Sequence, residues 1–185
     1  WSKGQLYQVS GSGYSPQGTL TSDTGGELSE AALDCLRCGM LCNESRLVQA
    51  DNQWKIDGDP TEGALLVAGR KARLDESELA RHWRRLDSVP FESEHQYMAT
   101  LHDTGSGRPR VIYLKGSVER TLERCNNIDE TEIHNIVASM GGVGLRVLAF
   151  ARKEVPFDQT SLSHDDVAEG LTFLGLQGMM DPPRP

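Results

Sequence analysis

The sequence has no long hydrophobic run. A transmembrane helix needs about 20 predominantly apolar residues in a row, and no stretch of the 185 residues approaches that length. Basic residues are also in deficit, since 19 Lys and Arg face 27 Asp and Glu and give a formal net charge of -8. This charge repels polyphosphate backbones, so we expect no nucleic acid partner. Because a long apolar run is missing, we also expect no direct membrane contact by this chain.

Sequence signals for processing and for catalysis are missing too. The chain begins with Trp1 and not with Met, and no signal peptide precedes it, so we expect both ends to be cut from a longer protein. Neither a G-x-G-x-x-G loop nor a P-loop is present. No nucleophile–base pair or H-E-x-x-H motif is visible either, and the histidines are scattered: His82, His95, His102, His134 and His164. We expect no catalytic residue in this chain.

Cysteine is scarce, and three of the four cysteines lie close together in "CLRCGMLC". Cys35, Cys38 and Cys42 share one face of a helix at these spacings. A C-x-x-C pair is a zinc-binding pattern, but no second pair or histidine cluster completes a site. We therefore expect reduced thiols packed as small apolar groups in a cytosolic core, and no metal site.

The composition, with 37% hydrophobic and 25% charged residues, suits a globular protein with one sizeable core. Strands joined by hairpins and helices in clusters predict an α+β fold, a largely antiparallel twisted sheet flanked by helices. "TGSGRP" is the expected turn of one hairpin. Strands are expected at 6–9, 54–56, at the start of the stretch "DSVPFESEHQYM", and at 97–103, 110–114, 145–155 and 171–179. Helices are expected at 27–41, 59–74, 117–125 and 129–140, with one more over "DESELARHWRRL", and Gly141–Gly142 should stop the fourth.

Two stretches carry candidate functional residues, and each of these residues also has an ordinary structural explanation. Asp59 is a good N-cap, and Glu62 three residues later closes a capping box in the simplest reading. In "VIYLKGSVER", Lys115 ends a strand, where it reaches an anionic or polar ligand or is merely solvated. Gly116 allows a ligand or another backbone to approach closely. Elsewhere, Phe91 belongs either to the core or to a binding surface. Arg146 either extends its guanidinium from a strand into water or contacts a ligand.

The order of five motifs resembles that of the nucleotide-binding domain of P-type cation-transporting ATPases. The motifs are "GDPTEGAL", "PFESEHQYM", "YLKGSVE", "GLRVLAF" and "GMMDPPRP". The likeness is closest to the branch with calcium and sodium/potassium pumps, which "VSGSGYSPQG" and "LCNES" also resemble. The resemblance implies one nucleotide-binding domain over residues 1–185, with N-terminal strands and an approach at 1–26 and a hinge at 179–185.

The resemblance also implies roles around adenine. Phe91 would stack on the base, as a flat ring meeting a flat base. Lys115 would be the pocket lysine and Gly116 the pocket floor, small so that the base can lie against its backbone. Glu62 would accept from the exocyclic amine of adenine, and Leu148 would line the pocket.

Around the phosphates the resemblance is less complete. Arg146 matches an arginine that reaches the phosphates with its guanidinium fork, and Met98 holds a usually apolar position. Gln96 replaces a second lysine, and Ser93 stands where some members have an arginine. The phosphate side of the pocket therefore carries less positive charge than is usual in the family. His95 lies nearby and partly replaces the missing charge only when it is protonated.

The motif D-K-T-G-T, which carries the family's phosphorylated aspartate, is absent. The resemblance thus implies a cytoplasmic, ATP-binding domain of an integral membrane protein, which uses Mg-ATP in the parent and is inactive alone. Its partners would be the phosphorylation and actuator domains of the parent. Gln96 favours an alternative, a regulatory or interaction module of the same fold with weak or no nucleotide binding. A free-standing kinase-like enzyme ranks last.

Overall fold

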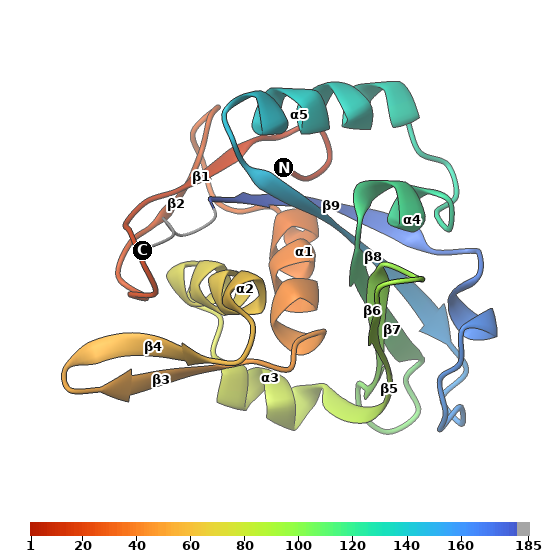
Figure 1. Ribbon diagram of the computed structural model, residues 1–185. Coiled ribbons are helices and arrows are strands. Elements are labelled where there is room, and N and C mark those ends of the chain that lie inside the picture. Colours follow the sequence, from red (N-terminus) through yellow and green to blue (C-terminus); the bar gives the residue numbers. More distant parts are fainter. Residues whose placement is uncertain (181–185) are drawn as a thin grey trace.

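Five antiparallel strands form the central sheet of the computed structural model, which describes residues 1–180 (Figure 1). The strand order is β5-β6-β7-β8-β9. With helices on both faces, this sheet confirms the α+β prediction. The strands are β5 (Arg84–Glu92), β6 (Tyr97–Asp103), β7 (Arg110–Gly116), β8 (Arg146–Val155) and β9 (Thr172–Met179). Residues 181–185, with the "DPPRP" motif and most of the expected hinge at 179–185, lie outside the described residues.

The hairpin of β6 and β7 fixes the register of the sheet. It turns through "TGSGRP", as predicted, and pairs Met98 with Lys115. On the other side of β7, Lys115 pairs with Phe150 of β8. Direct cross-strand neighbours share a face of a sheet, so these three side chains form a row on one face, and Tyr97 and Leu114 lie on the other.

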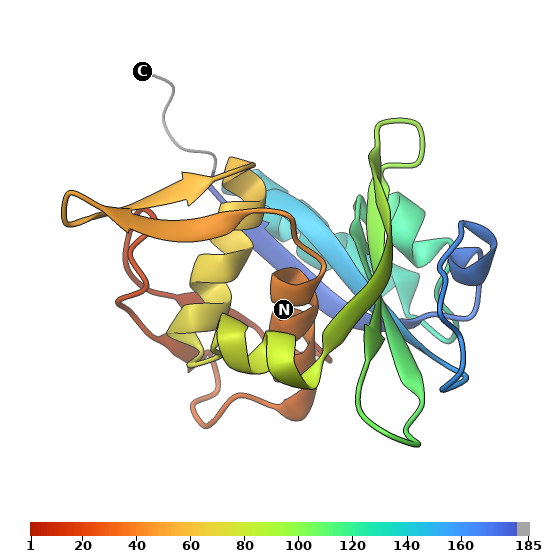
Figure 2. The same cartoon turned by 90° about the horizontal axis from the view of Figure 1, so that it is seen from below.

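Each face of the sheet has its own helices (Figures 1 and 2). The face with Met98, Tyr113 and Phe150 packs against α1 and α2 in one hydrophobic cluster. The opposite face packs against α4 and α5 and against the connection that leads from β8 to β9 through the short helix η1 (Asp165–Val167). The helices of the described part are α1 (Glu30–Leu41), α2 (Pro60–Lys71), α3 (Glu76–His82), α4 (Val118–Leu122) and α5 (Glu130–Gly142).

Five helix ends differ from the predicted ones. Helix α2 ends at Lys71 and not near Leu74, and α4 ends at Leu122 and not at Cys125. Helix α1 starts at Glu30 because the Ser29 hydroxyl accepts from the Ala32 N–H as an N-cap. The predicted helix over "DESELARHWRRL" is too long, because α3 ends at His82 and β5 begins at Arg84. Helix α5 extends two residues beyond the predicted end at Met140, because both glycines are helical, and it stops at Gly142 with Val143 as the C-cap.

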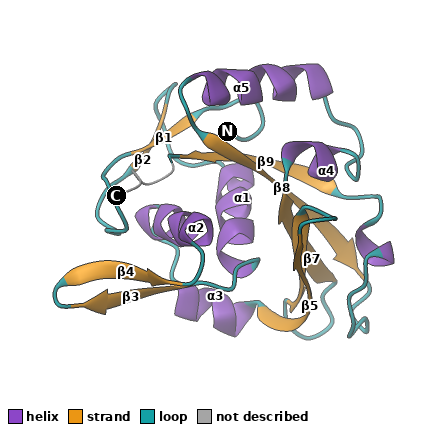
Figure 3. Cartoon of the chain, in the orientation of Figure 1, coloured by secondary structure: helices purple, strands orange, loops and turns teal. Residues whose placement is uncertain are grey.

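Two small sheets flank the core (Figure 3). In the N-terminal region β1 (Tyr7–Val9) pairs with β2 (Leu20–Ser22). The hairpin of β3 (Arg46–Ala50) and β4 (Gln53–Asp57) projects from the body, and β3 was not predicted. The first residues dock on β9, since the Trp1 amino group donates to the Leu176 carbonyl at 2.9 Å and the Ser2 hydroxyl to the Leu174 carbonyl at 2.6 Å.

The two cysteines of α1 and the cysteine that caps its end lie in the core as free thiols, as predicted. Cys35, Cys38 and Cys42 are buried. The Cys38 thiol donates to the Leu114 carbonyl at 3.4 Å, and burial raises the pKa of the Cys35 thiol to about 12. Among the described helices, none combines the length and the apolar character that a membrane span requires.

Candidate functional site

The first turn of α2 directs Glu62 toward the sheet. Asp59 caps this helix and accepts from the N–H groups of Thr61 and Glu62 at 2.8 and 3.0 Å. The N–H of Asp59 donates to the Ser45 hydroxyl at 2.8 Å. The capping-box interpretation of Glu62 is therefore wrong, because Ser45 takes the bond that a capping-box glutamate would accept.

The carboxylate of Glu62 instead meets Lys115 at the end of β7. The Lys115 ammonium donates to Oε1 at 2.5 Å, while the Ser45 hydroxyl and the Glu44 N–H donate to Oε2 at 2.9 and 3.0 Å. Burial by itself raises the pKa of Glu62, but the ammonium and these donors together hold that pKa below its ordinary value.

Lys115 is not the solvated strand-end lysine of the alternative interpretation. Its side chain is only 7% exposed, and it lies between Met98 and Phe150 in the cross-strand row. A buried ammonium needs a counter-charge because desolvation disfavours the charged form. Glu62 supplies it, so α2 and the sheet are joined by a charged hydrogen bond at this point.

Phe91 lies on the edge strand β5, with its side chain in water. It is 61% exposed, so the alternative that Phe91 belongs to the core is wrong. The register shift between Val89 and Glu92 places Pro90 and Phe91 opposite Met98. Because Glu92 pairs with Tyr97 on the opposite face, Phe91 falls on the face that carries Lys115.

Arg146 and Leu148 extend this face on β8. They lie four and two residues before Phe150, respectively, and alternate residues of a strand share a face. Leu148 is half-buried against the core. The exposed Arg146 guanidinium donates to the Thr61 hydroxyl at 3.0 Å. The first turn of α2 therefore contacts both β7, through Glu62, and β8, through Thr61.

Ser93 and Gln96 lie in the turn between β5 and β6, and both are exposed. Gln96 has a φ of 57°, and its carbonyl accepts from the Ser117 N–H at 2.9 Å, which ties the turn to the start of α4. His95 of the same turn lies 3.5 Å from the Glu92 carboxylate and its ring stacks beside His164. Sequence spacing gave no sign that these histidines meet.

The packing of the sheet requires a glycine at position 116, whether or not a ligand binds there. A Cβ at this position would lie 2.6 Å from the Gln96 carbonyl oxygen and 2.7 Å from the Tyr97 Cβ. The missing side chain would thus point at the backbone of β6, on the face opposite to Lys115. Close approach of another backbone explains the glycine, and contact of its own backbone with a base stays a prediction.

Two hollows of the described surface lie away from the predicted adenine residues. One, of about 190 Å³, opens between α1, α3 and the β5–β6 pair. The other, of about 380 Å³, opens beside the hairpin turn of β6 and β7. The first is lined by Met40, Leu41, Glu76, Leu79, Ala80, Trp83, Arg85 and His102. Phe91 and Arg146 are exposed and line neither hollow.

Comparison with known proteins identifies the family. Residues 31–185 match the family described as P-type ATPase, cytoplasmic domain N. The chain belongs to this family. A cation-transporting ATPase, pma1 of Synechocystis, is 48% identical over 200 residues, which cover 98% of this chain and 22% of the relative.

More distant relatives cover the chain equally well. The calcium-transporting ATPase of Bacillus subtilis is 31% identical over 201 residues, 100% of this chain and 22% of its own. The calcium-transporting ATPase type 2C member 1 of Pongo abelii is 32% identical over 199 residues, 99% of this chain and 20% of its own. The chain thus spans about a fifth of the length of these relatives, and the family resemblance inferred from the motifs is confirmed.

Two residues that hold the candidate site together were missed by sequence reasoning. Ser45 bridges Asp59 and Glu62, and Thr61 receives the Arg146 guanidinium. Both lie inside stretches whose likeness to the family was noted, "LCNES" and "GDPTEGAL". Short hydroxyl side chains carry no periodic signal, so only a motif could have singled them out.

Proposed function

We propose that this chain is the ATP-binding domain of a cation-transporting P-type ATPase. The observation that carries the proposal is an aromatic side chain, Phe91, 61% exposed on the same sheet face as the buried Lys115–Glu62 pair. Covering an exposed aromatic ring is favourable, and a flat base can stack on it. The family membership of the chain and the names of its relatives as cation- and calcium-transporting ATPases support the same function.

In this proposal adenine lies on the Phe91 ring and faces the end of β7. Glu62 accepts from the exocyclic amine, which its ionised state suits because a carboxylate is an acceptor only. Lys115 and the half-buried Leu148 form the inner wall. Met98 is only 2% exposed, so it supports Lys115 from below. The backbone of Gly116 borders the base.

The triphosphate then projects along the first turn of α2. Arg146, already at Thr61, is the guanidinium fork for phosphate oxygens, and Ser93 and Gln96 offer neutral polar groups from the β5–β6 turn. Mg-ATP supplies the phosphoryl group, and in-line transfer takes place on an aspartate of the parent's phosphorylation domain when the domains close. The role of this chain is to bind and present the nucleotide, with the phosphorylation and actuator domains of the parent as partners.

One observation favours a second function, a regulatory or interaction module of the same fold. The Lys115 ammonium already has a carboxylate partner, and Gln96 brings no charge to the phosphate side. A nucleotide must therefore compete with an ion pair that already satisfies the Lys115 ammonium. The site also offers fewer positive charges than the resemblance to the family implies.

Titration with ATP, followed by backbone amide chemical shifts, separates these functions. The first predicts saturable shifts around Phe91, Glu62 and Lys115 with a dissociation constant on the order of 1 mM, because stacking and a few polar contacts offset the cost of association. GTP carries a carbonyl where adenine has its amine, so it should bind more weakly. Unchanged shifts at several millimolar ATP would support the regulatory module.

A further inference from the structure

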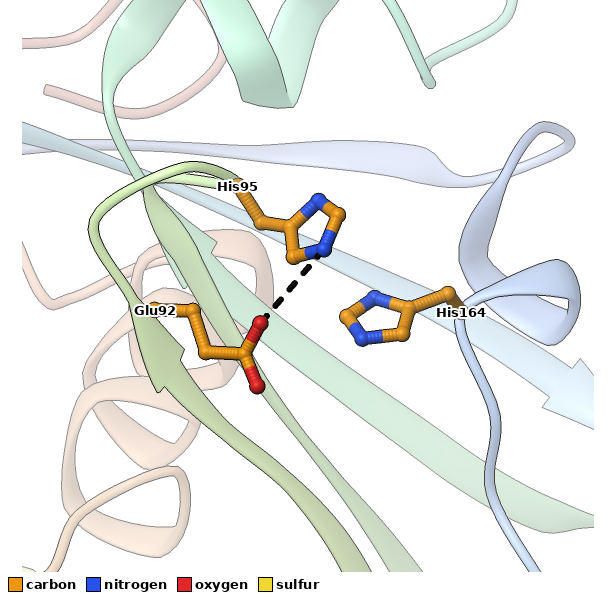
Figure 4. A group of neighbouring side chains, drawn as sticks. All are labelled: Glu92, His95 and His164. Atoms are coloured by element: carbon orange, nitrogen blue, oxygen red, sulfur yellow. Dashed lines mark ion pairs between the residues drawn. The ribbon is translucent and has the colours of Figure 1, made fainter.

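Two histidines and a carboxylate from distant parts of the chain meet beside the β5–β6 turn. Glu92 ends β5, His95 lies in the turn, and His164 precedes η1 in the connection from β8 to β9. Figure 4 shows the three side chains pointing toward one another. Each offers a ligand atom, and these atoms all lie within 4.8 Å of one another. The carboxylate lies 3.5 Å from Nε2 of His95, and the two imidazole rings are 4.2 Å apart at their centroids.

The set of donors suits a transition-metal ion. Two imidazoles and one carboxylate are the ligands of many three-residue zinc sites, which keep a fourth position for water. With bonds of about 2.0–2.2 Å in tetrahedral geometry, ligand atoms lie about 3.3 Å apart. Because Glu92 and His164 are exposed, rotations of their side chains close the remaining gap without moving the core. Mg²⁺ and Ca²⁺ prefer oxygen ligands.

Hydrogen bonds hold two of the three ligands in place. The hydroxyl of Tyr97, a residue only 1% exposed, is hydrogen-bonded to Nδ1 of His164 at 2.6 Å. When this Nδ1 donates its proton to the Tyr97 oxygen, the lone pair of Nε2 is free for a metal. Such a bond on the second ring nitrogen is what metal-binding histidines usually carry. The carbonyl of Glu92 accepts from the N–H groups of His95 and Gln96 at 3.1 and 2.7 Å, which fixes the turn.

The connection that carries His164 is fixed independently. Asp166 accepts from the Ser163 N–H and hydroxyl, both at 2.7 Å, directly before His164. The Lys153 ammonium donates to the Asp166 and Glu169 carbonyls, both at 2.9 Å. The two segments that supply the ligands are therefore both ordered by protein hydrogen bonds.

We propose that Glu92, His95 and His164 form a binding site for one Zn²⁺ or another divalent transition-metal ion of similar ligand preference. The site lies on the Tyr97 face of the sheet, opposite to Lys115, but it shares the β5–β6 turn with Ser93 and Gln96 of the proposed nucleotide site. A bound ion ties the β5–β6 turn to the connection between β8 and β9, two segments that are far apart in the sequence.

Calorimetric titration of the chain with Zn²⁺ tests this site without any nucleotide. We expect one ion per chain, and His164→Ala and Glu92→Gln should each weaken binding by more than about tenfold. His134→Ala is the matched control, because His134 is an exposed histidine of α5 bonded only to its own helix at the Glu130 carbonyl. Binding that remains in the His164→Ala variant measures zinc captured elsewhere, for example by the partly exposed Cys125.

A spectroscopic measurement distinguishes the site from a structural effect of the substitutions. Zn²⁺ should shift the imidazole nitrogen resonances of His95 and His164 and leave those of His134 and His82 in place, and Mg²⁺ should shift none of them. Equal zinc affinity of the unmodified chain and the His164→Ala and Glu92→Gln variants would overturn the proposal. Unshifted His95 and His164 resonances at saturating zinc would also overturn it.

Discussion

The ammonium group of Lys115 lies 2.5 Å from a carboxylate oxygen of Glu62, although 53 residues separate the two in the sequence. Their side chains are 7% and 15% exposed. The pair joins the end of a central strand to the first turn of α2, so it both fixes the packing of that helix and defines the inner wall of the proposed adenine site.

Glu62→Gln tests the structural part of this pairing. The substitution leaves a nearly buried ammonium without its counter-charge, so we expect the free energy of unfolding to fall by about 3 kcal/mol. The pKa of Glu62 is lowered on folding, so the stabilising effect is complete above the unfolded pKa of the carboxyl and is lost as pH falls through the folded value. The deficit of the variant should therefore shrink in acid.

Urea denaturation at neutral and acidic pH measures this deficit. Glu44→Gln is the control, because the Glu44 carboxylate pairs with Arg85 at 2.6 Å but is 61% exposed, and exposed pairs contribute about 0–1 kcal/mol. Equal stability of the Glu62→Gln variant and the unmodified chain at neutral pH would contradict the account of the pair.

Lys115→Met tests where the lysine acts on a nucleotide. If Lys115 lies near the base, the variant should lose affinity for ATP and ADP by the same factor, because both carry adenine. Lys55→Met, an exposed lysine of the β3–β4 hairpin, should bind both nucleotides normally. Competition titrations with the two nucleotides measure the ratio, and a loss confined to ATP would place the lysine at the terminal phosphate.

His102 should make the fold sensitive to mild acid. It is buried between the Trp83 carbonyl, 2.9 Å from Nδ1, and the Thr100 hydroxyl, 2.8 Å from Nε2. Burial lowers its pKa from 6.5 to about 4. Between about pH 6.5 and pH 4, His102 is therefore protonated in the unfolded chain and neutral in the folded chain. The free energy of unfolding is at its full value above about pH 6.5 and falls by about 3 kcal/mol toward pH 4.

The variant His102→Asn, which keeps a donor for the Trp83 carbonyl, should be less stable at pH 8 and should lose less stability between pH 7 and pH 4.5. His82→Asn, an exposed histidine of α3, should retain the pH dependence of the unmodified chain. An unchanged slope of unfolding free energy against pH in His102→Asn would show that another group titrates.

Gly116→Ala and Gly141→Ala should have opposite effects on stability. An added Cβ at 116 meets the Gln96 carbonyl at 2.6 Å, and overpacking of this kind costs about 1–3 kcal/mol. At 141, within α5, an added Cβ meets nothing within 4 Å, and Ala in a helix is about 0.5–1 kcal/mol better than Gly. Thermal unfolding of both variants tests this, and a stable Gly116→Ala would mean that β6 can move away.

Local signals in the sequence predicted much of the fold. The N-cap at Asp59, the hairpin over "TGSGRP" and the apolar face of α1 are encoded by neighbouring residues, and all three are present. Strand β3 was missed because only Leu47 of its five residues is buried, which leaves no alternating pattern. The start of β5 was assigned to a helix because its charged residues Arg84 and Arg85 look like the end of α3.

The candidate site could be predicted only in part for a similar reason. Family motifs singled out Glu62 and Lys115, but the ion pair between them is a tertiary contact that no local pattern contains. The meeting of His95 and His164 depends on how the connection after β8 returns across the sheet. Such contacts follow from topology, and topology is set by the whole core and not by neighbouring residues.

The central claim, that Phe91 is a binding surface for adenine, is tested most directly by the ATP affinity of Phe91→Ala beside that of Phe157→Ala. Both rings are exposed, at 61% and 63%, so neither substitution should unfold the chain. Since base–aromatic stacking contributes about 1–3 kcal/mol, Phe91→Ala should weaken ATP binding about tenfold, and Phe157→Ala should leave it unchanged. Equal affinities of the two variants, or unfolding of Phe91→Ala, would contradict the account.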